Sequence, residues 1–191
     1  MYMTITSGAH EFGGADTICV LRWTGLANMG DAHPAGQGDV DTARSADLVF
    51  VVSKAEIVGP DVYLSQRSTW PDGPALVRLD EVCFPVDAIA SRHTHCGSGF
   101  RHLVRGGLRI ETGTGETDMA VGDSWFEPAD TPVRAVSTHT DGVTSFVRCM
   151  VIPATHAGKS TFKSVDPADA ALPRLQVTHQ HLEHAIYVEA G

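Results

Sequence analysis

Two histidines separated by a single residue, His93 and His95, are the side chains of this sequence best suited to metal chemistry. They lie in a run with strand character, and side chains two positions apart on a strand point to the same face. Two adjacent imidazoles supply half of a transition-metal site, and usable sites generally have at least three protein ligands. The pair therefore predicts a metal site that needs a further ligand.

Short segments with strand character surround the pair, and glycine- and proline-containing turns separate them. The segment Gly113 to Glu116, for example, is typical of a hairpin turn. Short strands at this spacing indicate an all-β sandwich or barrel. The strand-like segments are 48–52, 62–64, 75–79, 81–84, 88–95, 102–104, 108–112, 117–121, 123–127, 133–136 and 144–152.

The strand series divides the chain into an N-terminal arm (1–45), a β-barrel (46–153) and a C-terminal extension (154–191). The arm contains one apolar segment, which predicts a strand or a short helix. The extension is polar, and Asp166 is placed to cap a short helix. Because an isolated extended arm must pair with something, we expect it to contribute to a homodimer.

Glycine and proline residues follow the histidine pair at characteristic spacings along the sequence. This arrangement resembles the two sequence motifs of the cupin superfamily: the first carries His-x-His, a glutamate and a glycine, and the second carries a glycine, a proline and a third histidine. The matching residues are His93, His95, Gly106, Gly122 and Pro128. The resemblance covers about residues 45–153. It implies a cupin-type jelly-roll β-barrel.

The chain departs from the cupin motifs at two ligand positions. The glutamate position falls on Gly99 or Phe100, and the third histidine is replaced by Val133. Asp87 and Asp130 stand where the motifs have further glycines. Because cupins hold one divalent metal with three histidines and one glutamate, the resemblance implies a divalent metal bound by an altered ligand set, with iron first and manganese, nickel or zinc as alternatives.

Three residues are candidates for the missing ligand. Glu127 is the first, because it precedes Pro128 on the strand that faces the pair, and it would complete a site of two histidines and one carboxylate. His102 is the second, although its parity relative to position 99 predicts an outward side chain unless a bulge intervenes. His139 is the third, and it lies near a loop.

Arg101 lies two positions after the lost glutamate, so its side chain should share the inward face. An arginine inside a barrel needs a carboxylate partner, which is either Glu127 or an anionic substrate held by two hydrogen bonds. We expect Arg101, Trp125 and His102 to contact substrate, although Trp125 is also a natural core residue. The runs His93–Arg101 and 125–127 are similar to runs in an unassigned cupin subgroup.

Other metal-binding residue types have simpler interpretations. Cys96 is adjacent to the pair but points to the opposite face by strand alternation, so we do not expect it to be a ligand. His179, His181 and His184 form a metal cluster by count, but solvated histidines in a polar tail are the default interpretation.

Composition limits the partners and the compartment. The 191 residues carry a formal net charge of −9, which argues against nucleic acid and anionic membrane surfaces, since both need a basic face. There is no apolar run of the roughly 20 residues that cross a bilayer, and the N-terminus has no signal-peptide pattern. The four cysteines show no paired spacing, so we expect a reducing, cytosolic setting.

The leading functional hypothesis is a metal-dependent enzyme, a non-haem Fe(II)-type dioxygenase acting on a small anionic molecule. His93, His95 and Glu127 would hold the iron and Arg101 would bind the substrate. Two alternatives stay open: a non-catalytic cupin that binds or senses a small molecule, and a non-redox lyase or isomerase with His93 or His95 as general base.

Overall fold

The computed structural model describes residues 1–7, 12, 15–23, 48–70 and 73–188. In these ranges the chain forms fourteen strands and two short 3-10 helices. The strands are β1 (Tyr2–Thr6), β2 (Thr17–Trp23), β3 (Leu48–Ser53), β4 (Val62–Arg67), β5 (Gly73–Phe84), β6 (Ile89–His95), β7 (Ser98–Arg105), β8 (Gly107–Thr112), β9 (Gly115–Ala120), β10 (Ser124–Glu127), β11 (Val133–Ser137), β12 (Thr144–Pro153), β13 (Phe162–Ser164) and β14 (Val177–Val188), and the helices are η1 (Ala154–His156) and η2 (Asp169–Ala171).

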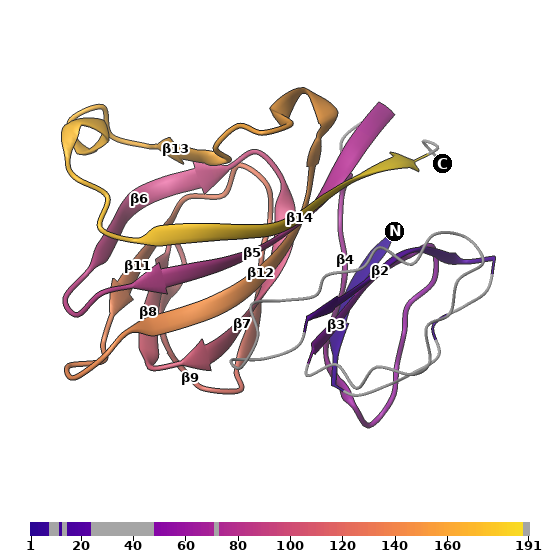
Figure 1. Cartoon of the computed structure of the whole chain (residues 1–191), viewed down its shortest axis with the longest axis horizontal. Helices are drawn as coiled ribbons and strands as arrows, with labels where there is room; N and C mark the ends of the chain where they lie inside the picture. Colours follow the sequence, from indigo (N-terminus) through magenta and orange to yellow (C-terminus); the bar gives the residue numbers. More distant parts are fainter. Residues whose placement is uncertain (8–11, 13–14, 24–47, 71–72, 189–191) are drawn as a thin grey trace.

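Two five-stranded antiparallel sheets form the barrel (Figure 1). One has the strand order β10-β7-β12-β5-β14, and the other has the order β13-β6-β11-β8-β9. Without the outermost strands β14 and β13, the strands β5 to β12 alternate between the sheets, except for the hairpin β8–β9, and this is the order of a jelly roll. The predicted jelly-roll fold is therefore confirmed.

Four turn residues, two glycines and two aspartates, have positive φ angles. Gly106 and Gly122 have φ angles of 76° and 97°, and a Cβ at Gly106 would lie 2.4 Å from the Thr144 hydroxyl. Asp87 and Asp130, which replace motif glycines, also have positive φ angles, of 60° and 55°. Aspartate is among the few side chains that tolerate this region, because its carboxylate can hydrogen-bond locally.

Strand alternation sends the residues of β12 to two different cores. Val147, Cys149 and Val151 belong to the cluster on the outer face of the sheet. Phe146 and Arg148 point to the barrel interior, where they line a cavity. Almost every residue of β12 is therefore buried, as expected for a strand covered on both faces.

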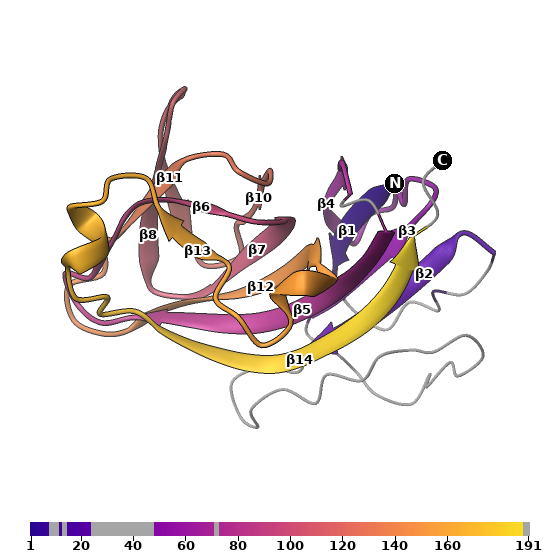
Figure 2. The same cartoon turned by 90° about the horizontal axis from the view of Figure 1, so that it is seen from above.

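A third, four-stranded sheet with the order β2-β3-β1-β4 covers that outer face. Its inner strand β3 is buried at all six positions, and alternate side chains of β3 pack with Ala75, Val77, Leu79 and Phe100 of the barrel. Figure 2 shows β5 and β14 running from the barrel to this sheet. The sheet takes β3 and β4 from the region assigned to the barrel by sequence, because an apolar strand pattern does not specify a partner. Residues 24–45 of the arm lie outside the described residues.

The C-terminal extension belongs to the barrel. β13 pairs with β6, and the twelve-residue strand β14 pairs with β5. His179, His181 and His184 are therefore on a paired strand and not in a tail, although His179 is exposed to solvent as expected. The predicted short helix is one 3-10 turn, η2, and the Asp166 carboxylate accepts a hydrogen bond of 2.8 Å from the Ala168 amide.

Candidate functional site

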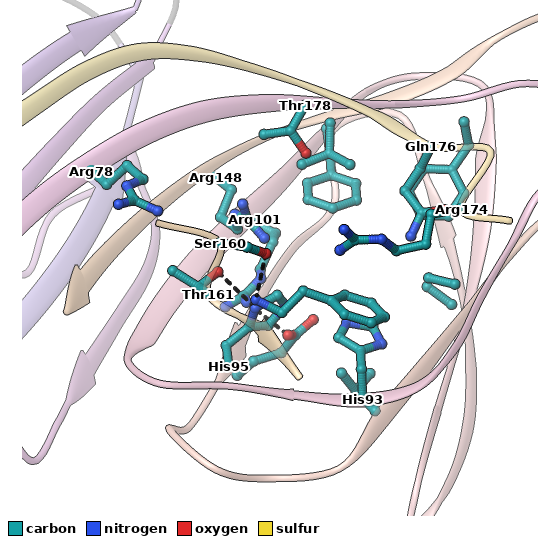
Figure 3. A pocket seen from close by; sticks show the side chains of 18 of the residues that line it. Arg78, His93, His95, Arg101, Arg148, Ser160, Thr161, Arg174, Gln176 and Thr178 are labelled. Atoms are coloured by element: carbon teal, nitrogen blue, oxygen red, sulfur yellow. Dashed lines mark hydrogen bonds and ion pairs between the residues drawn. The ribbon is translucent and has the colours of Figure 1, made fainter. Parts of the chain in front are cut away.

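The barrel encloses a cavity of about 450 Å³ between its two sheets, within the range of roughly 300–1,000 Å³ typical of ligand sites. One part of its wall is apolar and includes Phe84, Trp125 and Phe146, and another part is polar and cationic. The lining residues come from both sheets and from the segment that leads into β14. Figure 3 shows the polar part of the wall, with the labelled arginines directed into the cavity.

His93 and His95 both line this cavity, as their spacing on β6 predicts. Their ring centroids are 4.9 Å apart, and the rings meet edge to face. The His93 ring stacks on Phe162 of β13 with a centroid distance of 4.2 Å. His95 Nδ1 lies 3.0 Å from the Thr161 hydroxyl, a contact drawn in Figure 3. Residues next to and within β13 thus fix the orientation of both rings.

Burial keeps both imidazoles neutral near pH 7. Desolvation lowers the pKa of His93, and it lowers the pKa of His95 well below 6.5, with Arg148 and Arg101 adding to the effect. His93 Nδ1 donates a hydrogen bond of 2.7 Å to the Ser91 carbonyl oxygen. Because a carbonyl can only accept, Nδ1 holds the proton and Nε2 keeps a free lone pair. His93 can therefore accept a proton or coordinate a metal through Nε2.

Glu127 lines the same cavity, but both of its oxygens are engaged. Oε2 lies 2.7 Å from Nη2 of Arg101, and Oε1 accepts a hydrogen bond of 2.8 Å from the Trp125 indole. Arg101 is buried, and its Nη1 also donates to the Gly99 carbonyl. Desolvation lowers the Arg101 pKa to about 10, but the guanidinium stays charged at neutral pH. Of the two partners expected for Arg101, the structure shows the internal one.

The donor set does not complete the predicted metal site. Among the described residues, no three histidine, cysteine, aspartate or glutamate side chains are grouped closely enough to hold a metal ion. Val133, at the position of the third histidine, lies opposite His93 on β11. Gly99 lies opposite Glu127, and a Cβ there would meet the Cys149 carbonyl oxygen at 2.4 Å. No side chain can occupy this position without a backbone shift, which explains the lost glutamate.

The other two ligand candidates lie elsewhere. His102 is on the outer face of β7, where it contacts the Ser124 hydroxyl at 2.8 Å and the Tyr63 ring at a centroid distance of 4.9 Å. It does not line the cavity, so the expectation that it contacts substrate there is wrong, because no bulge reverses its parity. His139 pairs with Asp141 in an exposed loop. Cys96 packs in a separate apolar cluster.

Four arginines line the cavity, and three of them have a carboxylate partner. Arg101 pairs with Glu127, Arg148 pairs with Asp80, and Arg78 pairs with Glu183. The fourth is Arg174, whose guanidinium carbon lies 4.9 Å from the centroid of the Phe162 ring. Within the described part of the chain, Arg174 has no carboxylate partner.

The C-terminal segment supplies wall residues that sequence reasoning missed. Thr161 and Phe162 orient the histidines, and Arg174, Gln176 and Thr178 also line the cavity. A signal was present, because Gln176, Thr178 and Gln180 alternate with other residues as on a strand. These polar side chains line the cavity, and three of them, Arg174, Thr178 and Gln180, are also exposed to solvent.

Comparisons with solved structures give partial likenesses at low sequence identity. No family model matches the sequence, and no curated protein matches it. A cupin domain from Bordetella pertussis Tohama I is 18% identical with a TM-score of 0.36, covering 46% of this chain and 99% of that one. A sugar phosphate isomerase of the cupin superfamily from Silicibacter pomeroyi is 21% identical with a TM-score of 0.36, covering 40% of this chain and 51% of that one.

AerE from Microcystis aeruginosa is 9% identical with a TM-score of 0.42, covering 80% of this chain and 78% of that one. The strand order of the two barrel sheets is that of a jelly roll. A fold of this kind supports both enzymes and binding proteins, so the function has to be argued from the site. The described residues contain no helix long and apolar enough to cross a membrane.

Proposed function

We propose that the barrel binds a small anionic organic molecule and that His93 acts on it as a general base, in non-redox lyase or isomerase chemistry. One observation carries the proposal: a neutral imidazole with a fixed tautomer and a cationic wall share one cavity. This is a metal-independent use of the two histidines that the cupin resemblance singles out.

The charges of the wall support an anionic ligand. Arg78, Arg101 and Arg148 are each offset by one carboxylate. Arg174 and Lys159 also line the cavity and have no carboxylate partner among the described residues. The wall therefore keeps a positive charge, and a ligand carboxylate would offset it with charge-assisted hydrogen bonds.

The state of His93 supports a base. A neutral imidazole whose Nδ1 is held by a carbonyl oxygen can take a proton at Nε2 from a carbon next to a carbonyl group. The electron pair left on that carbon would move toward the carbonyl oxygen, where a guanidinium stabilises the negative charge. Return of the proton to another carbon gives an isomer, and loss of a neighbouring leaving group gives a lyase product.

The test uses untagged protein in a strong chelator with a panel of small 2-oxo and 3-oxo carboxylic acids. We expect at least one acid to raise the melting temperature and to exchange carbon-bound hydrogen for deuterium in D₂O, measured by NMR. His93→Asn keeps a donor for the Ser91 carbonyl but removes the base, so it should bind the acid and abolish the exchange. His139→Asn, at an exposed loop position outside the cavity, is the control.

Three outcomes would change the proposal. If the chelated protein binds none of the acids, the anionic cavity site is rejected. If binding occurs without exchange in the wild-type protein, the non-catalytic binding or sensing cupin replaces the enzyme. If His93→Asn exchanges as fast as wild type, His93 is not the base.

The dioxygenase stays a second candidate, because one observation favours it. Metal-ligating histidines usually have their other ring nitrogen held by a hydrogen bond, as His93 and His95 do. The site still needs a third ligand, and releasing Glu127 from Arg101 would leave a buried guanidinium unpaired. Elemental analysis of wild type and His93→Ala/His95→Ala tests it: a near-stoichiometric metal lost in the double variant would restore this hypothesis.

The homodimer and the cytosolic setting stay predictions. The N-terminal strands pair within their own chain and cover the barrel sheet. Light scattering of the purified protein measures its mass directly.

A further inference from the structure

Arg174 differs from the other arginines of the cavity in where it lies. It belongs to the irregular segment between η2 and β14, whereas Arg78, Arg101 and Arg148 are on barrel strands. Arg174 is an exposed residue whose side chain lines the cavity. Figure 3 shows its guanidinium directed toward Arg101 and Arg148. Arg174 therefore reaches inward from the mouth of the barrel.

The hydrogen-bonding capacity of Arg174 is unused. A guanidinium has five N–H donors in a fork that fits a carboxylate, yet its one interaction within the described residues is with the Phe162 ring. Arg101 and Arg148 are buried, and each already holds a carboxylate, Glu127 or Asp80, which neutralises its charge. Breaking such a pair is costly. An incoming anion can therefore bind Arg174 without competing with a carboxylate of the protein.

Another part of the cavity wall has a different chemistry. The Trp125 and Phe146 rings meet edge to face with centroids 5.3 Å apart, and Phe84 and Phe146 are 6.0 Å apart. These aromatic rings line the cavity together with aliphatic side chains. A ligand that fills both parts needs an anionic end and an apolar, preferably flat, body.

We propose that Arg174 is the residue that anchors the ligand, and that the ligand is a small carboxylate with an aromatic or similarly flat apolar body. This inference rests on the proposed anion-binding function and deepens it. Phe162 contacts both Arg174 and His93, so the anchor and the base lie in the same part of the cavity. The segment that carries Arg174 thereby sets which carboxylates are accepted.

The experiment compares three probes by calorimetric titration in the presence of a chelator. Phenylacetate has the anion and the flat body, benzyl alcohol has the body alone, and acetate has the anion alone. We expect wild type to bind phenylacetate more tightly than either of the others. Arg174→Gln should weaken phenylacetate binding about tenfold or more, because it removes a charge-assisted pair, and should leave benzyl alcohol unchanged.

Arg92→Gln is the matched control, since Arg92 is an exposed arginine on β6 that does not line the cavity. Arg174→Lys tests the fork geometry and should recover only part of the affinity. The melting temperature of free Arg174→Gln should equal that of wild type, because Arg174 has no ion pair in the described structure.

The outcomes separate this inference from the proposed function. If wild type binds phenylacetate and Arg174→Gln binds it equally well, Arg174 is not the anchor, and the anionic cavity site stands. If acetate binds as well as phenylacetate, the flat apolar body is rejected. If wild type binds no carboxylate, the proposed function fails with the inference.

Discussion

The two faces of the sheet β10-β7-β12-β5-β14 differ in chemistry although the same strands supply both. On the outer face, Val77, Leu79, Phe100 and Val147 pack with the N-terminal sheet in one apolar cluster. The inner face carries charged residues at alternate positions of the same strands: Arg78, Asp80, Arg101 and Arg148. One face therefore resembles an ordinary core and the other resembles a binding site.

The difference shows which face holds the fold together. Apolar burial stabilises a protein by about 25 cal/mol per Å², whereas a buried ion pair is often no more stabilising than apolar residues of similar volume. The inner charges are therefore poor candidates for stabilising the barrel, and they make sense if a ligand uses the cavity. Variants on the two faces should separate stability from ligand binding.

The largest effect is expected on the outer face. Phe100 is fully buried and meets Phe126 with centroids 5.3 Å apart. Phe100→Ala should lower the free energy of unfolding by about 4 kcal/mol, since it removes a large side chain and leaves a cavity. Urea denaturation measures the loss. The increase in the free energy of unfolding that a bound ligand produces should be the same in Phe100→Ala as in wild type. A smaller increase would contradict the division between the faces.

A somewhat smaller effect is expected from the inner ion pair of Arg148 and Asp80, in which Arg148 Nε lies 3.2 Å from Oδ2. Arg148→Met alone should destabilise the protein by about 3 kcal/mol, because the Asp80 carboxylate is left buried and unpaired. Asp80→Leu/Arg148→Met should recover most of this loss. A double variant as unstable as the single variant would mean that the pair holds the barrel together.

The smallest effect is a dependence on pH that originates on the opposite sheet. Burial lowers the pKa of His93 and His95 from the ordinary 6.5. Below this value the unfolded chain binds more protons than the folded one, so stability is fully present above about pH 6.5 and falls as the pH drops toward the lowered pKa. The slope is at most about 1.4 kcal/mol per pH unit for each histidine.

Thermal unfolding between pH 5 and 8 measures this slope. His95→Gln should flatten it, and Phe100→Ala should shift the whole curve downward without changing its shape. His139→Gln serves as a control, since His139 lies in an exposed loop. An unchanged slope in His95→Gln would show that the buried imidazoles do not control the acid response.

Sequence reasoning found the barrel because its signals are local. Strand alternation placed His93, His95 and Arg101 on inward faces, the motif resemblance placed Glu127 there, and all four line the cavity. Turn residues with positive φ, such as Gly106, marked the ends of strands. The pairing of β3 with β1 and β2 could not be predicted in the same way, because an apolar strand run indicates burial without naming the partner strand.

The site was harder to predict because it joins distant segments. The pairing of Glu127 with Arg101 was foreseen as one of two alternatives, since each side chain needs an opposite charge. The contribution of Phe162 and Arg174 was not foreseen. Their role depends on the chain returning across the barrel mouth. The local sequence of a polar segment does not determine where that segment packs in the fold.

The pairing of β14 with β5 also has a consequence for how the molecule is made. Arg78 and Glu183, which join these strands, are 105 positions apart, and pairings of such high contact order form slowly because a long loop must close first. During synthesis the ribosome releases β5 to β12 well before Arg174 and β14 emerge. The jelly roll can thus assemble while its binding cavity is still open on one side, and recognition of a ligand comes last.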